Sequence, residues 1–105
     1  MTLLAVYTTL ATRDDAQRIA TAMVERRLAA CAQIEAIESV YRWQGAVQRE
    51  PEFRLMLKTT EARYPALEAA ILALHPYDLP AIHAVAVVRA HAHYAAWVVD
   101  GSTAT

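Results

Sequence analysis

The stretch SVYRWQGAVQREPEFRLMLKTT, residues 39–60, decides the fold that we expect for this chain. Aromatic and β-branched residues alternate with polar ones before the Gln-Gly pair at 44–45. After that pair, Phe53, Leu55 and Leu57 share one face of a second run, with a period of two. Glycine adopts positive φ without steric cost, as a two-residue hairpin turn requires. The stretch therefore predicts a long β-hairpin.

Two features of this hairpin point beyond a single chain. Pro51 has no N–H for a ladder, so the return strand should either bulge there or have a free edge. A hairpin this long leaves edge backbone groups uncovered, and another subunit is the simplest cover. Tyr41 and Trp43 lie near the tip, where one chain buries large rings poorly, so they favour an interface between subunits.

The rest of the chain supplies two more strands and three helices, and it extends the first strand of the hairpin back to residue 29. Strands are expected over residues 3–9, 29–41 and 81–88, and the helices over 13–28, 61–74 and 91–99. Thr12 is the expected cap of the first helix, and Pro76 ends the second. The core-facing residues are expected to include Ala16, Ile19, Ala20, Met23, Val24, Tyr64, Leu67, Ile71, Leu74, Tyr94, Trp97 and Val98.

The order of these elements predicts an α+β, ferredoxin-like βαββαβ fold with an added C-terminal helix and a long hairpin between the second and third strands. The first two helices should pack on one face of an antiparallel sheet. We expect residues 1–105 to form a single domain of this kind, with residues 101–105 as a frayed tail.

Charge and cysteine content narrow the classes of function. Ten Lys and Arg stand against eleven Asp and Glu, a net charge of −1, which argues against nucleic acid as a partner. The N-terminal apolar run lacks a basic flank and stops at Tyr7, so we expect neither a signal peptide nor a membrane span. Cys31 is the only cysteine in the sequence, so the chain cannot form a framework of internal disulfides. A cytoplasmic protein is the interpretation that fits.

Metal binding is the sharper chemical hypothesis, because no nucleophile motif points to an enzyme. Cys31 and the four histidines form a ligand set suited to copper or zinc. His83 is expected at the sheet surface, and His91 and His93 are expected to point in different directions toward solvent. His75 ends a helix, whose dipole would favour a protonated ring, and it is either a satisfied cap or a metal ligand.

Several separated blocks resemble one family, the CutA1 divalent-cation-tolerance proteins. They are Tyr7-Thr8-Thr9, Leu28-Ala29-Ala30-Cys31, the run SVYRWQG from Ser39, Leu57-Lys58-Thr59-Thr60, Arg63-Tyr64-Pro65-Ala66-Leu67 and the run HPYDLP from His75, closed by Tyr94 and Trp97. The resemblance implies a ferredoxin-like subunit in a tight homotrimer, similar to the PII signalling proteins. It also implies a non-catalytic link to tolerance of Cu²⁺ and other divalent cations. The trimer-interface candidates are Tyr41, Trp43, Gln44 and Phe53.

The sequence departs from the family pattern in three places. Glu35-Ala36 stands where Pro-Gly is usual, and Ala81 stands where a glutamate is common. Thr8 and Leu74 stand where some copper-binding members carry a cysteine and a histidine. The remaining metal-ligand candidates are His75 and Cys31.

Two alternatives to the metal hypothesis remain open. One is a PII-like small-molecule sensor with a cleft between subunits, contacted by Lys58, His75 and Tyr77. The other is a stable trimer that acts as an assembly platform without a ligand.

Overall fold

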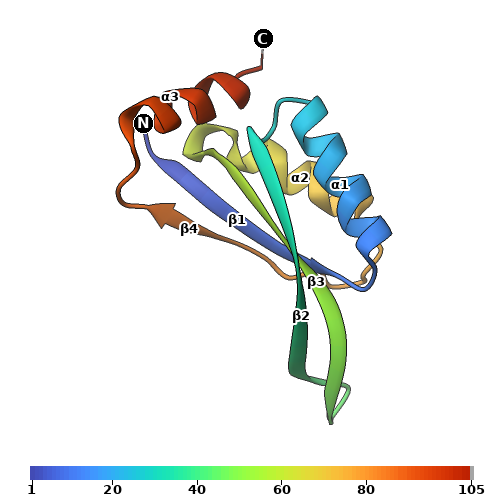
Figure 1. The fold of residues 1–105 in the computed structure, drawn as a ribbon. Coiled ribbons are helices and arrows are strands. Elements are labelled where there is room, and N and C mark those ends of the chain that lie inside the picture. Colours follow the sequence, from blue (N-terminus) through green and yellow to red (C-terminus); the bar gives the residue numbers. More distant parts are fainter. Residues whose placement is uncertain (105) are drawn as a thin grey trace.

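The computed structural model describes residues 1–104 and contains the expected succession of elements. Figure 1 shows them along the chain. They are β1 (Leu3–Leu10), α1 (Arg13–Glu25), β2 (Cys31–Trp43), β3 (Ala46–Thr60), the 3-10 turn η1 (Glu61–Arg63), α2 (Tyr64–Leu74), β4 (Ile82–Val87) and α3 (Ala92–Gly101). The predicted α+β, ferredoxin-like fold with an added C-terminal helix is confirmed. No helix among the described residues is long and apolar enough to cross a membrane.

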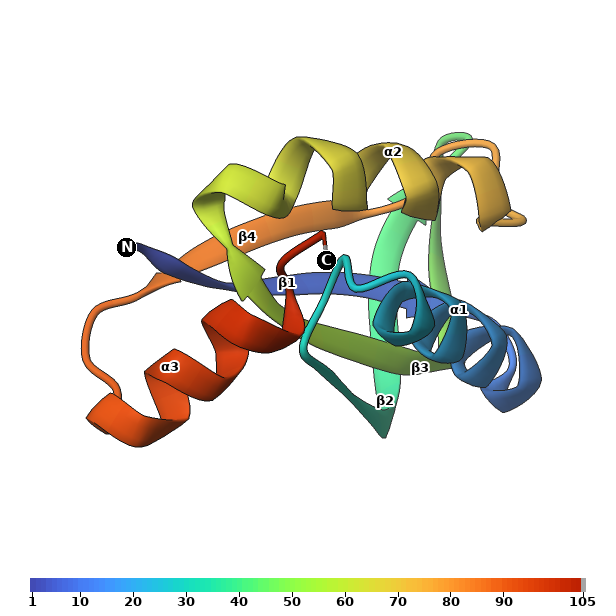
Figure 2. The ribbon, with the colours of Figure 1, turned by 90° about the horizontal axis from the view of Figure 1, so that it is seen from above.

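The four strands form one antiparallel sheet in the order β2-β3-β1-β4. Helices α1 and α2 cover one face of it, as predicted, and Figures 1 and 2 show their positions. The core between these layers includes Val6, Leu10, Ile19, Met23, Leu55, Leu57, Leu67 and Ile71. Because side chains alternate along a strand, Arg54, Met56 and Lys58 lie on the opposite side, which we call the open face.

The hairpin extends well beyond the sheet. Strand β2 pairs with β3 without a bulge from Cys31↔Lys58 to Trp43↔Ala46. Strand β1 follows β3 only as far as Leu10↔Phe53. Residues 37–43 and 46–52 therefore form a two-stranded arm, which projects downward in Figure 1 and contributes to the elongated dimensions of 45 × 25 × 21 Å.

The turn of the arm has the backbone that its sequence predicts. Gln44 has a φ of 50° and Gly45 a φ of 80°, the two positive values of a type I′ turn. The residues that flank such a turn form a hydrogen-bonded pair, and the pairs then alternate in type. Glu38 and Pro51 consequently form a non-hydrogen-bonded pair, and the nitrogen of Pro51 faces the edge that β1 does not reach. The free edge expected at Pro51 is confirmed, and the alternative bulge is wrong.

Helix α1 is capped at both ends. The Thr12 hydroxyl accepts a hydrogen bond from the backbone N–H of Asp15 at 3.1 Å, as predicted. At the other end, the N–H of Leu28 donates to the Met23 carbonyl, and Arg27 has a φ of 58°. This is a Schellman motif with arginine in the left-handed position.

Val24 is exposed, contrary to the predicted stripe on α1. It lies about 100° around the helix from Met23, which already faces the core.

Helix α3 packs across one end of the open face, where Val98 meets Leu3 and Ala30. Only this narrow side of α3 is covered. The expectation that Trp97 faces inward is therefore wrong: its ring stacks on that of Tyr94 at 5.9 Å and the residue remains 52% exposed. Tyr94 is 38% exposed, and its ring contacts the sheet without being buried in the core.

The chain beyond Val99 is more ordered than the sequence suggests. Gly101 belongs to α3, and the Ser102 hydroxyl is buried and donates to the Val98 carbonyl at 2.6 Å. The Arg27 guanidinium donates to the Thr103 carbonyl at 2.7 Å, which anchors this segment to the end of α1. The predicted frayed tail is wrong for residues 101–102, and residue 105 lies outside the described residues.

Candidate functional site

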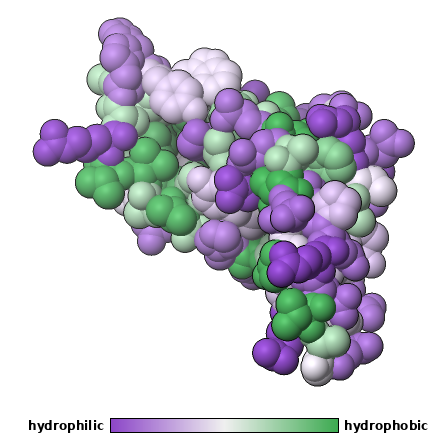
Figure 3. Space-filling view, turned by 60° about the horizontal axis from the view of Figure 1, so that its bottom comes forward, coloured by the Kyte–Doolittle hydropathy of each residue, from purple (hydrophilic) through white to green (hydrophobic). Residues whose placement is uncertain are grey.

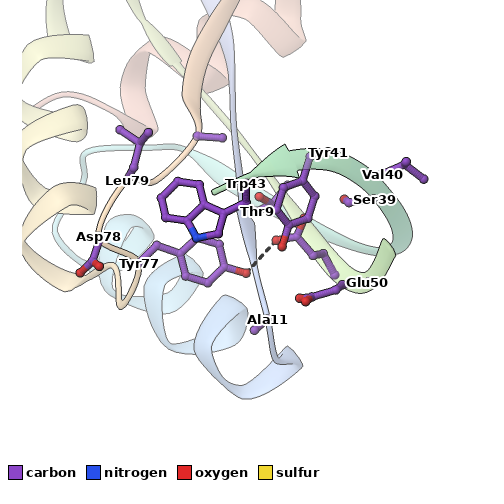
Figure 4. Close-up of a pocket in the computed structure, with 12 residues that line it drawn as sticks. Thr9, Ala11, Ser39, Val40, Tyr41, Trp43, Glu50, Tyr77, Asp78 and Leu79 are labelled. Carbon is purple, nitrogen blue, oxygen red and sulfur yellow. Dashed lines mark hydrogen bonds between the residues drawn. The ribbon is translucent and has the colours of Figure 1, made fainter. Parts of the chain in front are cut away.

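A groove of about 640 Å³ lies where the arm joins the open face of the sheet. Tyr41 and Trp43 reach it from β2, and Glu50 and Glu52 reach it from β3. The period of two along each strand places these four side chains on the same face. Figure 4 shows the labelled rings close together beside the carboxylates. The lining comprises Thr9, Ala11, Ser39, Val40, Tyr41, Trp43, Glu50, Glu52, Tyr77, Asp78, Leu79 and Ala81.

Tyr77 enters the groove from the loop after α2. His75 is extended, because Pro76 follows it, and α2 therefore ends at Leu74 as predicted. The loop brings the Tyr77 hydroxyl within 2.7 Å of Glu52 Oε2, to which it donates the hydrogen bond drawn in Figure 4. Burial raises the pKa of Tyr77, and the bond to Glu52 raises it further. Tyr77 is thus a protonated donor at neutral pH.

His75 is buried beside the groove, and both of its ring nitrogens are engaged. Nε2 lies 2.9 Å from the Thr9 carbonyl, and Nδ1 accepts the backbone N–H of Tyr77 at 3.2 Å. A carbonyl only accepts, so the ring is the neutral tautomer that carries its hydrogen on Nε2. Burial lowers the pKa of His75, although the Thr9 carbonyl opposes this shift. The expectation of a protonated ring is wrong, because loss of hydration outweighs the helix dipole.

Cys31 and Lys58 lie toward the other end of the sheet. They are paired residues of β2 and β3, and both approach Tyr94 of α3. The Cys31 sulfur is 3.8 Å from the Tyr94 hydroxyl, and Lys58 Nζ is 5.9 Å from the ring centroid. Along β3, Lys58 is four residues from Arg54, the partner of Thr9, a separation of about 13 Å.

Two groupings inferred from the sequence are therefore not formed within one chain. Lys58 does not line the groove that Tyr77 enters. Cys31 likewise stands apart from His75, which contacts Thr9. Among residues 1–104, the structure holds no group of three or more His, Cys, Asp or Glu placed to bind one metal ion.

The other three histidines are all exposed, as predicted, but one expectation about the directions of their rings is wrong. His83 lies on the open face, as predicted, with its ring stacked on Tyr7 at 5.3 Å. His91 and His93 do not point apart, and their ring centroids are 5.5 Å from each other. His91 is the extended N-cap of α3 rather than a helical residue, which turns its ring toward His93.

A second, smaller hollow of about 280 Å³ lies on the open face beside Arg54. The Arg54 guanidinium donates to a Glu35 carboxylate oxygen at 2.8 Å and stands over the Tyr7 ring at 5.5 Å. Glu35, one of the departures from the family pattern, is thus the charge partner of Arg54.

Sequence reasoning missed the acidic side of the groove. Glu50 and Glu52 alternate along β3 and face the same side as Tyr41 and Trp43, so the period of two contained the signal. The approach of Asp78 and Tyr77 from a distant loop had no comparable signal in the sequence.

A ferredoxin-like sheet with a long projecting arm defines the structural class of this molecule. Comparison with known proteins then gives the family. The model of the CutA1 divalent ion tolerance protein family matches residues 4–101, and this chain belongs to that family.

Relatives from distant organisms match nearly the whole chain. A divalent-cation tolerance protein CutA of Thermus thermophilus is 40% identical over 94 residues, which cover 89% of this chain and 91% of the relative. A solved structure of CutA from Synechococcus elongatus has a TM-score of 0.94 at 37% identity and covers 97% of this chain and 91% of that chain. The structure of CutA1 from Oryza sativa has a TM-score of 0.95 at 32% identity, with coverage of 100% and 97%.

Proposed function

We propose that this chain acts as a homotrimer in tolerance of divalent metal ions, with copper as the leading candidate, in the cytoplasm and without catalysis. The observation that carries the proposal is membership of the CutA1 divalent ion tolerance family over residues 4–101. The curated relatives from Thermus thermophilus and Pyrococcus horikoshii bear the name divalent-cation tolerance protein. A relative from Archaeoglobus fulgidus is described as periplasmic, so location needs a direct measurement, such as cell fractionation.

The unpaired edges of the arm support the trimer. Beyond Leu10↔Phe53, β3 has hydrogen-bonded neighbours on one side only, and β2 is an outer strand along its whole length. Exposed edges of this kind pair readily with another chain. Apolar side chains also remain on the surface of the lone chain, where Figure 3 shows green hydrophobic patches among the purple polar ones. Those on the arm include Val40, Tyr41, Trp43 and Val47.

The four proposed interface residues differ in how much of their surface remains for a partner. Tyr41 is 39% exposed and Trp43 is 43% exposed. Gln44 is exposed at the tip of the arm, in the turn. Phe53 is half-buried against the core of its own chain, with the Arg13 guanidinium 4.8 Å above its ring. We therefore expect Tyr41 and Trp43 to contribute more to assembly than Phe53.

We propose that a divalent metal ion binds directly at His75 and Cys31. The contacts of these two residues determine what such binding would require. A metal ion at His75 must displace either the Thr9 carbonyl or the N–H of Tyr77 from the ring. A site that uses both His75 and Cys31 needs ligands from a second chain, because they stand apart in one chain. Imidazole binds copper when neutral, and burial keeps His75 neutral.

A Cu²⁺ titration of the untagged protein tests this proposal. The His75→Ala and Cys31→Ser variants should each bind Cu²⁺ more weakly than the wild type, whereas the exposed His93→Ala variant serves as the control. Equal Cu²⁺ affinity in all four proteins would remove His75 and Cys31 as ligands. Expression in a bacterial strain without its own family member tests the wider role, and unchanged growth at high copper concentration would contradict it.

The groove favours a second candidate function, a small-molecule sensor. Its volume of about 640 Å³ lies within the range of small-ligand sites, roughly 300–1,000 Å³. Tyr77, predicted as a ligand contact, lines this groove. A calorimetric screen of amines, nucleotides and organic acids distinguishes this function from a stable platform without a ligand, for which no compound would bind saturably.

A further inference from the structure

We propose that the groove binds a small organic cation, an ammonium or guanidinium group on an apolar body. This inference rests on the second candidate function, binding of a small molecule in the groove, and it gives the chemical class of that molecule. Tyr41 and Trp43 are also the proposed trimer contacts, so in the proposed trimer the groove is one wall of a cleft between subunits, and the two rings serve both the partner and the ligand. Of the 12 residues that line the groove, three carry a carboxylate and three an aromatic ring. None of the 12 is Lys, Arg or His.

Glu52 supplies the strongest part of the argument. Glu52 is only 8% exposed, and among the described residues the one hydrogen bond of its side chain is donated by the Tyr77 hydroxyl. Within residues 1–104, no Lys, Arg or His forms an ion pair with it. Arg54, two residues along the same face, is already paired with Glu35. A buried carboxylate without a cation is costly, so a cationic ligand would find an unmatched partner there.

The aromatic rings supply the second part. Tyr41, Trp43 and Tyr77 converge on the groove from two separate segments of the chain (Figure 4). The face of an aromatic ring attracts a cation within about 6 Å of its centre, and tryptophan does so most strongly. Burial raises the pKa of Tyr41, and the charges of Glu50 and Glu52 raise it further. The same carboxylates would therefore favour a positive charge beside the rings.

Two other classes of ligand fit the lining less well. An anionic metabolite would face Glu50, Glu52 and Asp78 with no cation in the lining to receive it. For a metal ion, the carboxylates of the groove do not converge on one point in the described part of the chain. A cation on an apolar body matches both the charge and the rings.

A matched trio of probes tests the inference: phenethylammonium, 2-phenylethanol and 3-phenylpropionate share one aromatic body and differ in charge. The Trp97→Phe background leaves Trp43 as the one tryptophan, so its emission reports on the groove. Phenethylammonium should change this emission saturably and bind at least about tenfold more tightly than either of the other probes. Calorimetry on the same samples checks that the response is binding.

Charge-neutral variants complete the test. Glu52→Gln keeps a hydrogen-bond acceptor for Tyr77 but removes the charge, and should weaken phenethylammonium binding about tenfold while leaving 2-phenylethanol unchanged. Glu50→Gln is a second variant at a less buried position, and Glu38→Gln, on the arm but outside the lining, is the control. Both groove variants should weaken binding of the ammonium probe, and the control should not.

The possible results separate this inference from the function on which it rests. Equal binding of all three probes, or preference for 3-phenylpropionate, would overturn the cation inference and leave a small-molecule groove in place. The same conclusion follows if Glu52→Gln and Glu50→Gln bind phenethylammonium as tightly as Glu38→Gln does. No saturable change with any probe up to about 10 mM would overturn both.

Discussion

Replacing Trp43 with alanine should weaken the proposed trimer by more than it perturbs the fold of one chain. Trp43 is 43% exposed in the lone chain, and a tryptophan buries up to about 250 Å². Roughly 100 Å² therefore remain for a partner to cover. At about 25 cal/mol per Å², this area corresponds to about 2.5 kcal/mol per subunit, or about 7.5 kcal/mol for the three copies in one trimer. The association constant of the trimer should fall by about five orders of magnitude.

Sedimentation velocity over a dilution series measures this loss directly, with circular dichroism to verify that the chain stays folded. Leu72→Ala is the matched control, because Leu72 is 50% exposed but lies on α2, in the helix layer and outside the arm. The control should dissociate at the same concentration as the wild type. If Trp43→Ala dissociates no more readily than Leu72→Ala, the arm does not hold the assembly together.

The remaining predictions concern two glycines and one histidine. Gly45→Ala should lower the free energy of unfolding by about 1–2 kcal/mol, because its φ of 80° strains any side chain although its Cβ would meet nothing within 4 Å. Gly101→Ala should lower the free energy of unfolding by about 1–3 kcal/mol for a different reason, because its Cβ would lie 2.8 Å from the Cβ of Ala30. Adding Ala30→Gly should therefore restore the stability of Gly101→Ala but not that of Gly45→Ala. Urea unfolding measures both, and equal rescue of both variants would contradict the two mechanisms. Burial lowers the pKa of the His75 ring in the folded chain below its ordinary value of 6.5. As the pH falls, the unfolded chain therefore binds a proton at this ring before the folded chain does. The contribution of the neutral ring to the free energy of unfolding is fully present above about pH 6.5 and should be lost as the pH drops. His75→Gln should reduce this loss between about pH 7 and pH 5, and an identical pH dependence in the two proteins would show that His75 is not its source.

Much of the fold could be predicted because its signals are local. The glycine at 45 and the alternation on either side of it identified the arm, and the turn has the backbone that they imply. Pro76 fixed the end of α2, and Thr12 fixed the start of α1. Helix α3 was harder to predict, because the side of a short helix that is covered depends on how the helix packs. Of the three residues expected to face inward, only Val98 is fully buried.

The candidate site was less accessible to sequence reasoning because it joins distant segments. Tyr77 and Glu52 are 25 residues apart, and no periodic pattern connects them. The protonation state of His75 depends on its burial and on the Thr9 carbonyl, 66 residues away. Lys58 and Tyr77 each belong to a recognisable block, but the strand register places them toward opposite ends of the sheet.

The mass of the intact protein in solution tests the central claim most directly, the claim that an arm with unpaired edges recruits further copies of the chain. Size-exclusion chromatography with light scattering, at micromolar concentration and without an affinity tag, should give three times the chain mass of 11.6 kDa. A folded species of 11.6 kDa under the same conditions would contradict the claim.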